Sequence, residues 1–148
     1  MQLESRSILF LVIALTLLMA SAWGCSEVSD APANFSEERL RARIAFARSQ
    51  FSSGDFEAYV KMWSARMRPS FRESEEDWQK NLRSWRLFLD REKPTFELLD
   101  VQITGLRARA KMRVSVLDTD GSRAYGTTYD YWVFENDDWF LDDAGRSE

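Results

Sequence analysis

The sequence predicts an α+β domain in which three helices pack on one face of a four-stranded antiparallel sheet. Apolar residues recur with a helical period of about 3.6 before Pro94 and with a strand period of 2 after it. The loop at residues 119–121 (TDG) and the turn at residues 136–137 (ND) separate the later strands at hairpin spacing. Helices followed by a run of strands are typical of the α+β class.

The first helix is expected over residues 35–51, with Asn34 and Glu37 as its capping box. Gly54 ends this helix, and Asp55 begins the second one. The apolar stripe of the first helix consists of Leu40, Ile44, Ala47 and Phe51, and that of the second of Phe56, Tyr59, Val60 and Trp63.

A third helix follows the break at Pro69. Ser74 is its expected cap, and the acids after it suit the first turn of a helix. Its apolar stripe consists of Trp78, Leu82, Trp85 and Leu89.

Four strands are expected, over residues 95–104, 106–116, 123–135 and 138–142. The apolar parity changes within the first strand, which predicts a bulge near Leu99 and Asp100. In the second strand, every other residue from Leu106 to Val116 is expected to face the core.

The hairpin loop fixes the register of the two central strands. If Asp118 lies opposite Ser122, then Met112 faces Thr128 and Ala110 faces Asp130. Asp130 is then the one carboxylate on the apolar face of the sheet.

The N-terminus resembles a bacterial lipoprotein signal. Residues 8–20 have the length of a signal h-region, and Gly24 precedes Cys25, the only cysteine of the chain. The resemblance implies acylation at Cys25 and a division into a signal peptide (1–24), a lipidated tether (25–34) and a folded domain (35–148). Ser26 resembles the sorting signal for the outer membrane, which implies its periplasmic face in a Gram-negative cell.

Two other fates of this segment stay open. Residues 20–22 (ASA) form an ordinary signal-peptidase site, whose use would release a soluble secreted protein. Alternatively, the apolar run stays uncleaved as a short anchor. All three fates place the domain outside the cytoplasm.

Composition excludes several classes of function. The net charge of −4 argues against a nucleic-acid partner, because phosphate binding needs a dominant basic face. The chain has no histidine, which excludes Ser-His-Asp and Cys-His catalysis and removes the commonest zinc ligand. We expect neither a metal nor a cofactor.

The domain resembles the nuclear transport factor 2-like superfamily. The resemblance covers about residues 35–142, and it depends on residues 53–56 (SGDF), 131–134 (YWVF) and 138–141 (DWFL). It implies a cone-shaped, cystatin-like α+β barrel with a pocket at its mouth. Members include ketosteroid isomerases, SnoaL-type polyketide cyclases and non-enzymatic binding modules, so the fold alone does not settle function.

A buried carboxylate must either be paired with a cation or have its pKa raised by loss of water. In an apolar pocket, a carboxylate with a raised pKa can act as a general base or anchor a ligand, so Asp130 is the candidate for these roles. Tyr59 is the candidate hydrogen-bond donor beside it. The expected ligand pocket consists of Trp63, Met112, Thr128, Asp130 and Trp132. The alternatives are an ion pair of Asp130 with Arg48 or Arg66, and an ordinary core role for Tyr59.

The other sheet face alternates basic and aromatic residues. Arg109 and Lys111 lie opposite Tyr131 and Tyr129 in the expected register, an arrangement suited to cation–π contacts. This face is either a solvated surface or the interface of a homodimer. Two functions therefore remain: an envelope lipoprotein that binds a small apolar ligand or a partner, and a cofactor-independent isomerase or cyclase with Asp130 as base.

Overall fold

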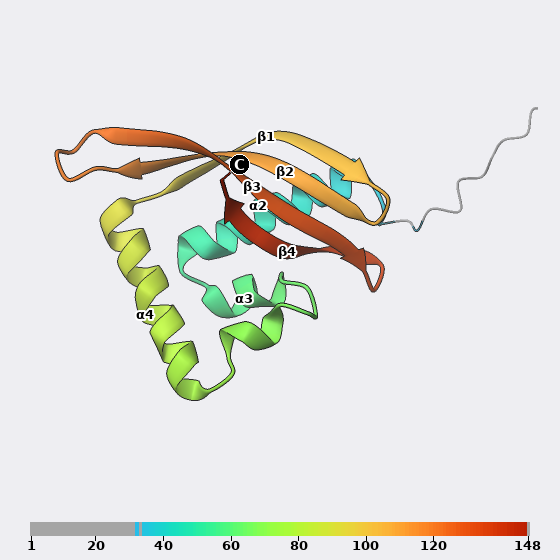
Figure 1. Cartoon of the computed structure of the whole chain (residues 1–148), viewed down its shortest axis with the longest axis horizontal. Coiled ribbons are helices and arrows are strands. Elements are labelled where there is room, and N and C mark those ends of the chain that lie inside the picture. The colour runs from blue at the N-terminus through green and yellow to red at the C-terminus, as the bar shows by residue number, and fades with distance from the viewer. Residues whose placement is uncertain (1–31, 33, 148) are drawn as a thin grey trace, which may run out of the picture. The chain divides into compact units, whose positions relative to one another are not determined.

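The computed structural model describes residue 32 and residues 34–147, so the predicted signal peptide, Cys25 and most of the tether lie outside the described residues. The elements, in chain order, are α2 (Glu37–Ser53), α3 (Phe56–Lys61), the 3₁₀ helix η1 (Arg68–Phe71), α4 (Glu75–Glu92), β1 (Thr95–Thr104), β2 (Arg107–Leu117), β3 (Arg123–Glu135) and β4 (Asp138–Arg146). The strands form one antiparallel sheet in the order β1-β2-β3-β4. The predicted α+β class is confirmed, with helix α2 beneath a curved sheet and α4 extending away from it (Figure 1).

The register of the central hairpin is the predicted one. Met112 lies opposite Thr128, and Ala110 lies opposite Asp130. Gly121 adopts the left-handed conformation, with φ of 85°, that the three-residue loop requires. The predicted bulge of β1 is also present, because the pairing with β2 skips a residue between Leu98 and Asp100.

Strand β4 is longer than predicted. The pattern favoured an end at Asp142, yet the strand continues to Arg146. The β3–β4 register shifts twice, on either side of Tyr131, which lies opposite Asp143. These irregularities break the alternation of inward and outward side chains, so the sequence pattern could not show the last residues of the strand.

The cap of α2 differs from the predicted one. Ser36 is the N-cap, and its Oγ accepts a hydrogen bond of 3.0 Å from the backbone N–H of Arg39. Asn34 instead donates from Nδ2 to Asp137 in the β3–β4 turn, at 3.2 Å. Asn and Ser are both favourable N-cap residues. Because the side chain of Asn34 is engaged with Asp137, Ser36 is the residue that caps the helix. The predicted caps Asp55 and Ser74 are confirmed for α3 and α4.

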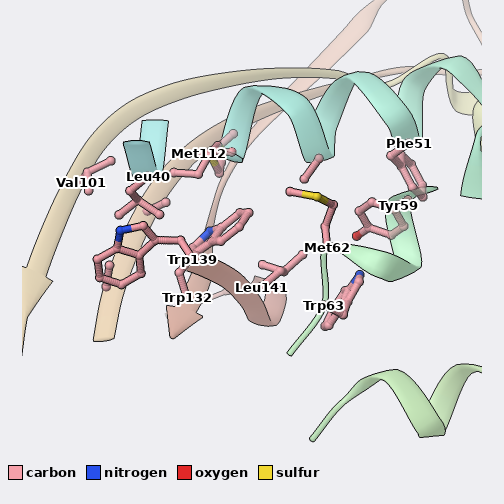
Figure 2. Close-up of a cluster of buried hydrophobic side chains, with 14 of the residues drawn as sticks. Leu40, Phe51, Tyr59, Met62, Trp63, Val101, Met112, Trp132, Trp139 and Leu141 are labelled. Carbon is pink, nitrogen blue, oxygen red and sulfur yellow. The ribbon is translucent and has the colours of Figure 1, made fainter. Parts of the chain in front are cut away.

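The core lies between α2 and the inner face of the sheet. Figure 2 shows Leu40 and Met112 at the interface of helix and sheet, with Trp132, Trp139 and Leu141 packed beneath. Burying one such side chain contributes about 1.5–3 kcal/mol. The prediction that Leu106 faces the core is wrong. Its side chain is 60% exposed, because it belongs to the β1–β2 turn rather than to β2.

The segment after α3 pairs with the outer edge of β4 at Leu141. Trp63 forms a parallel bridge with Leu141, and the N–H groups of Ser64 and Leu141 each donate a 2.8 Å hydrogen bond across it. This pairing satisfies backbone groups that an edge strand would leave open. None of the helices in the described part of the chain is long and apolar enough to span a membrane.

Candidate functional site: a buried ion pair beside two grooves

Asp130 is fully buried in the inner face of β3. Its Oδ2 accepts a hydrogen bond from Nη2 of Arg48 on α2, and its Oδ1 accepts one of 3.1 Å from the N–H of Gly145. Of the two arginines considered from the sequence, Arg48 is therefore the partner, while Arg66 binds Asp142. The carboxylate is in a buried ion pair with a backbone donor on its other oxygen, which is the arrangement that makes a buried charge tolerable.

Two local features bring these groups together. Arg48 follows Ala47 of the buried α2 stripe, so its side chain leaves the helix at the margin of the core. The irregular register of β4 places Gly145 over Asp130, and its φ of 71° is one that glycine adopts without strain. The carboxylate is thus held by α2 from one side and by β4 from the other.

The guanidinium of Arg48 is largely removed from water, with its side chain 15% exposed. Burial lowers the pKa of this arginine, while the negative charge of Tyr59 would raise it. The cation lies over the ring of Phe96, 4.8 Å from the ring centre. Its Nε is buried and has no hydrogen-bond partner among the described residues.

Two grooves meet at Arg48 and Phe96. The mouth groove has a volume of about 260 Å³ and is lined by Arg48, Phe51, Phe88, Phe96, Val114, Thr128, Ala144 and Gly145. The helix groove, of about 390 Å³, lies between α2 and the first two strands and is lined by Arg41, Ile44, Ala45, Arg48, Ser49, Ser52, Phe96, Leu98 and Met112. The mouth groove is small for a ligand site and mostly apolar, as such sites usually are.

The five predicted pocket residues do not line a single cavity. Thr128 lines the mouth groove and Met112 lines the helix groove. Trp63 and Trp132 pack into the core, and Asp130 lies behind Arg48. The register placed all four sheet residues on the correct face, but it could not show how far helix α2 fills the space above them.

Tyr59 is a core residue of α3, surrounded by aromatic rings. The ring centres of Phe51 and Trp85 lie 5.0 and 5.8 Å from its own, and Figure 2 shows it beside Phe51. Burial raises the pKa of its hydroxyl, and the nearby charge of Arg48 lowers it in part. The polar groups bonded to Asp130 in the described structure are Arg48 and Gly145 rather than Tyr59.

A second buried carboxylate, Asp142, was missed by the sequence analysis. It accepts hydrogen bonds of 2.6 Å from Ser64 Oγ and 2.9 Å from Arg66 Nη2. Burial alone would raise its pKa, but the bonds from Arg66 and Ser64 hold that pKa below the ordinary value of an aspartate. The group fastens the segment after α3 to β4. No local pattern signals it, because its members lie about 78 residues apart.

The outer sheet face has the predicted pairing. Arg109 lies opposite Tyr131, and Lys111 lies opposite Tyr129. The guanidinium of Arg109 lies 4.9 Å from the ring centre of Tyr129, which is itself buried beneath the basic side chains. The large exposed aromatic of this region is Tyr125, at 70%.

No model of a protein family matches this chain, and no curated protein is significantly similar to it in sequence. Solved structures do resemble it. A SEC-C motif containing protein from Rhodopseudomonas palustris superposes with a TM-score of 0.54 at 13% identity, over 74% of this chain and 76% of that one. A chain named Rd1NTF2_05, which carries five substitutions, gives 0.54 at 11% identity, over 74% and 98%.

A third structure, a protein of the nuclear transport factor 2-like family from Streptomyces avermitilis, gives 0.49 at 17% identity, over 73% of this chain and 92% of that one. Identities this low concern the fold and not the activity. Together with the topology of three helices and a curved four-stranded sheet, the two superpositions at a TM-score of 0.54 show that the described domain has the nuclear transport factor 2-like fold.

Proposed function

We propose that this protein is a non-catalytic binding module that takes a small, mainly apolar ligand in the mouth groove. The observation that carries the proposal is the ion pair between Arg48 and Asp130, placed directly behind an apolar groove. A general base must be free to accept a proton from its substrate. Here both carboxylate oxygens of Asp130 already accept hydrogen bonds, one of them from a cation.

The same pair weakens the enzyme hypothesis. An isomerase or cyclase with Asp130 as base needs that carboxylate at the cavity wall, whereas Asp130 is fully buried and absent from the lining of both grooves. Tyr59, the expected donor, is enclosed by aromatic rings. A binding role asks only for a shaped apolar surface and few polar groups, which the mouth groove offers.

We propose further that the module works at the cell envelope, acylated at Cys25. The support is the apolar run at residues 8–20 followed by Gly24 and Cys25. If residues 26–33 were fully extended they would span about 26 Å, enough to hold a domain just off a lipid surface. On this proposal, the module captures apolar molecules that are near the membrane.

The ligand site is tested with two neighbouring threonines of β3. Thr128 lines the mouth groove, whereas Thr127 faces the opposite side of the sheet and is exposed. The uncharged dye N-phenyl-1-naphthylamine should gain fluorescence with the unmodified protein and with Thr127→Phe. Thr128→Phe should abolish the gain because it fills the groove. Equal fluorescence with both variants would place dye binding elsewhere and defeat the proposal.

A further inference from the structure

The lining of the mouth groove contains one charged side chain among the described residues, Arg48. Taken alone, this lining would suit an anion, because an arginine in an apolar cleft is a strong carboxylate receptor. The residue behind the lining changes that conclusion. Asp130 contacts the same guanidinium from within the core, so the charge of Arg48 is already balanced before any ligand arrives.

We infer that Asp130 is a specificity-determining residue, which excludes anionic amphiphiles from the mouth groove and selects uncharged apolar ligands with a hydrogen-bond acceptor. This inference rests on the proposed ligand-binding function. An anionic ligand beside the neutral pair would leave one net negative charge in a poorly hydrated site, which is costly. An uncharged carbonyl or ester oxygen adds no charge and accepts a hydrogen bond.

Arg48 still has donors to offer such an acceptor. A guanidinium carries five N–H groups, and the described contact with Asp130 engages Nη2. Nε has no hydrogen-bond partner in the described structure, although the side chain retains 15% exposure at the junction of the two grooves. Arg48 lines both grooves beside Phe96, so the N–H groups that Asp130 does not engage are the charged donors nearest to a ligand in the mouth groove.

Asp130 gives this selectivity by making the binding of anionic ligands unfavourable, and not by adding a contact to uncharged ones. We therefore predict that removing the charge of Asp130 inverts the preference between uncharged and anionic ligands. Asp130→Asn keeps the shape and an acceptor for the N–H of Gly145, but it leaves the charge of Arg48 without a counter-ion. The groove of that variant should become an anion receptor.

The experiment uses two probes with the same body, methyl 4-phenylbutyrate and 4-phenylbutyrate, titrated calorimetrically at pH 7 where the acid is ionised. The unmodified protein should bind the ester at least tenfold more tightly than the acid. Asp130→Asn should bind the acid at least as tightly as the ester. Asp90→Asn, an exposed α4 residue outside both linings, makes the same change in net charge and should keep the original preference.

Each outcome decides the question. If the unmodified protein binds the acid as tightly as the ester, the inference is overturned and the proposed function stands. If neither probe binds, the proposed function fails as well. An unchanged preference in Asp130→Asn also overturns the inference. Should that variant unfold at the assay temperature, its thermal midpoint is measured with each probe, and the acid should raise it more than the ester. The opposite order refutes the role of Asp130.

Discussion

Replacing Asp130 by asparagine tests the central contact of the structure. The substitution keeps the shape and the acceptor for the Gly145 N–H, and it removes one charge of a buried pair. Stranding the partner of such a pair costs about 3–5 kcal/mol. Because the Arg48 side chain is still 15% exposed, some water reaches it and we expect the lower end, about 3 kcal/mol.

Urea unfolding at pH 7 measures this loss. Domains of this size have slopes of about 1.5 kcal/mol per molar urea, so the midpoint should fall by about 2 M. Native domains typically have free energies of unfolding of about 5–15 kcal/mol, so a loss of about 3 kcal/mol should leave the variant folded in the absence of urea. The double variant Arg48→Met with Asp130→Leu removes both charges and should recover most or all of the loss.

The two results together separate pairing from packing. A large loss in Asp130→Asn with recovery in the double variant identifies the ion pair as the cause. If Asp130→Asn is instead as stable as the unmodified protein, or more stable, then Arg48 does not balance this carboxylate. The ion pair would then not stabilise the fold, and Asp130 would again be a candidate base.

Three further predictions concern other parts of the chain. Ser36→Ala should destabilise the domain by about 1 kcal/mol through loss of the α2 cap, and Asn34→Ala by less; a larger loss at Asn34 in urea unfolding would contradict the cap seen here. Labelled fatty acid should enter the unmodified protein in bacterial cells but not Cys25→Ser, and equal labelling of both would reject acylation at this cysteine. Asp142→Asn should lower stability at neutral pH by about 1 kcal/mol, with the exposed Asp90→Asn as control. The folded-state pKa of Asp142 lies below its unfolded value of about 3.9, so its contribution is complete above that pH and fades as the pH falls through the folded-state pKa. A difference from the unmodified protein that does not shrink as the pH falls below about 4 would show another cause.

The pairing of the strands could be predicted because the hairpin turns determine which residues lie opposite each other. The loop before Ser122 and the turn before Asp138 each set how two strands pair, and every side chain between them then takes a known face. This is why the sequence placed Asp130 on the inner face. The pattern failed where bulges break alternation, which is the reason that Ala144 and Gly145 were not recognised as strand and groove residues.

The candidate site was harder to predict, because it depends on distances between elements. Arg48 was one of two arginines considered, and the sequence offered no means to choose between them. The structure separates them: Arg48 leaves α2 beside the inner face of the sheet, whereas Arg66 follows α3 and reaches Asp142 at the edge of β4. Helical phase determines which face a residue occupies, but not which strand lies under it.

The chemistry of the groove follows from this pairing and not from the residues that line it. A carboxylate in an apolar interior can serve as a base only while it lacks a cation, and a cation in an apolar groove can attract an anion only while it lacks a carboxylate. In this chain, Arg48 and Asp130 each remove the other's reactivity. What remains beside Phe96 is a neutral, mainly apolar surface at which Nε of Arg48 has no hydrogen-bond partner among the described residues, and this supports the proposed capture of an uncharged ligand.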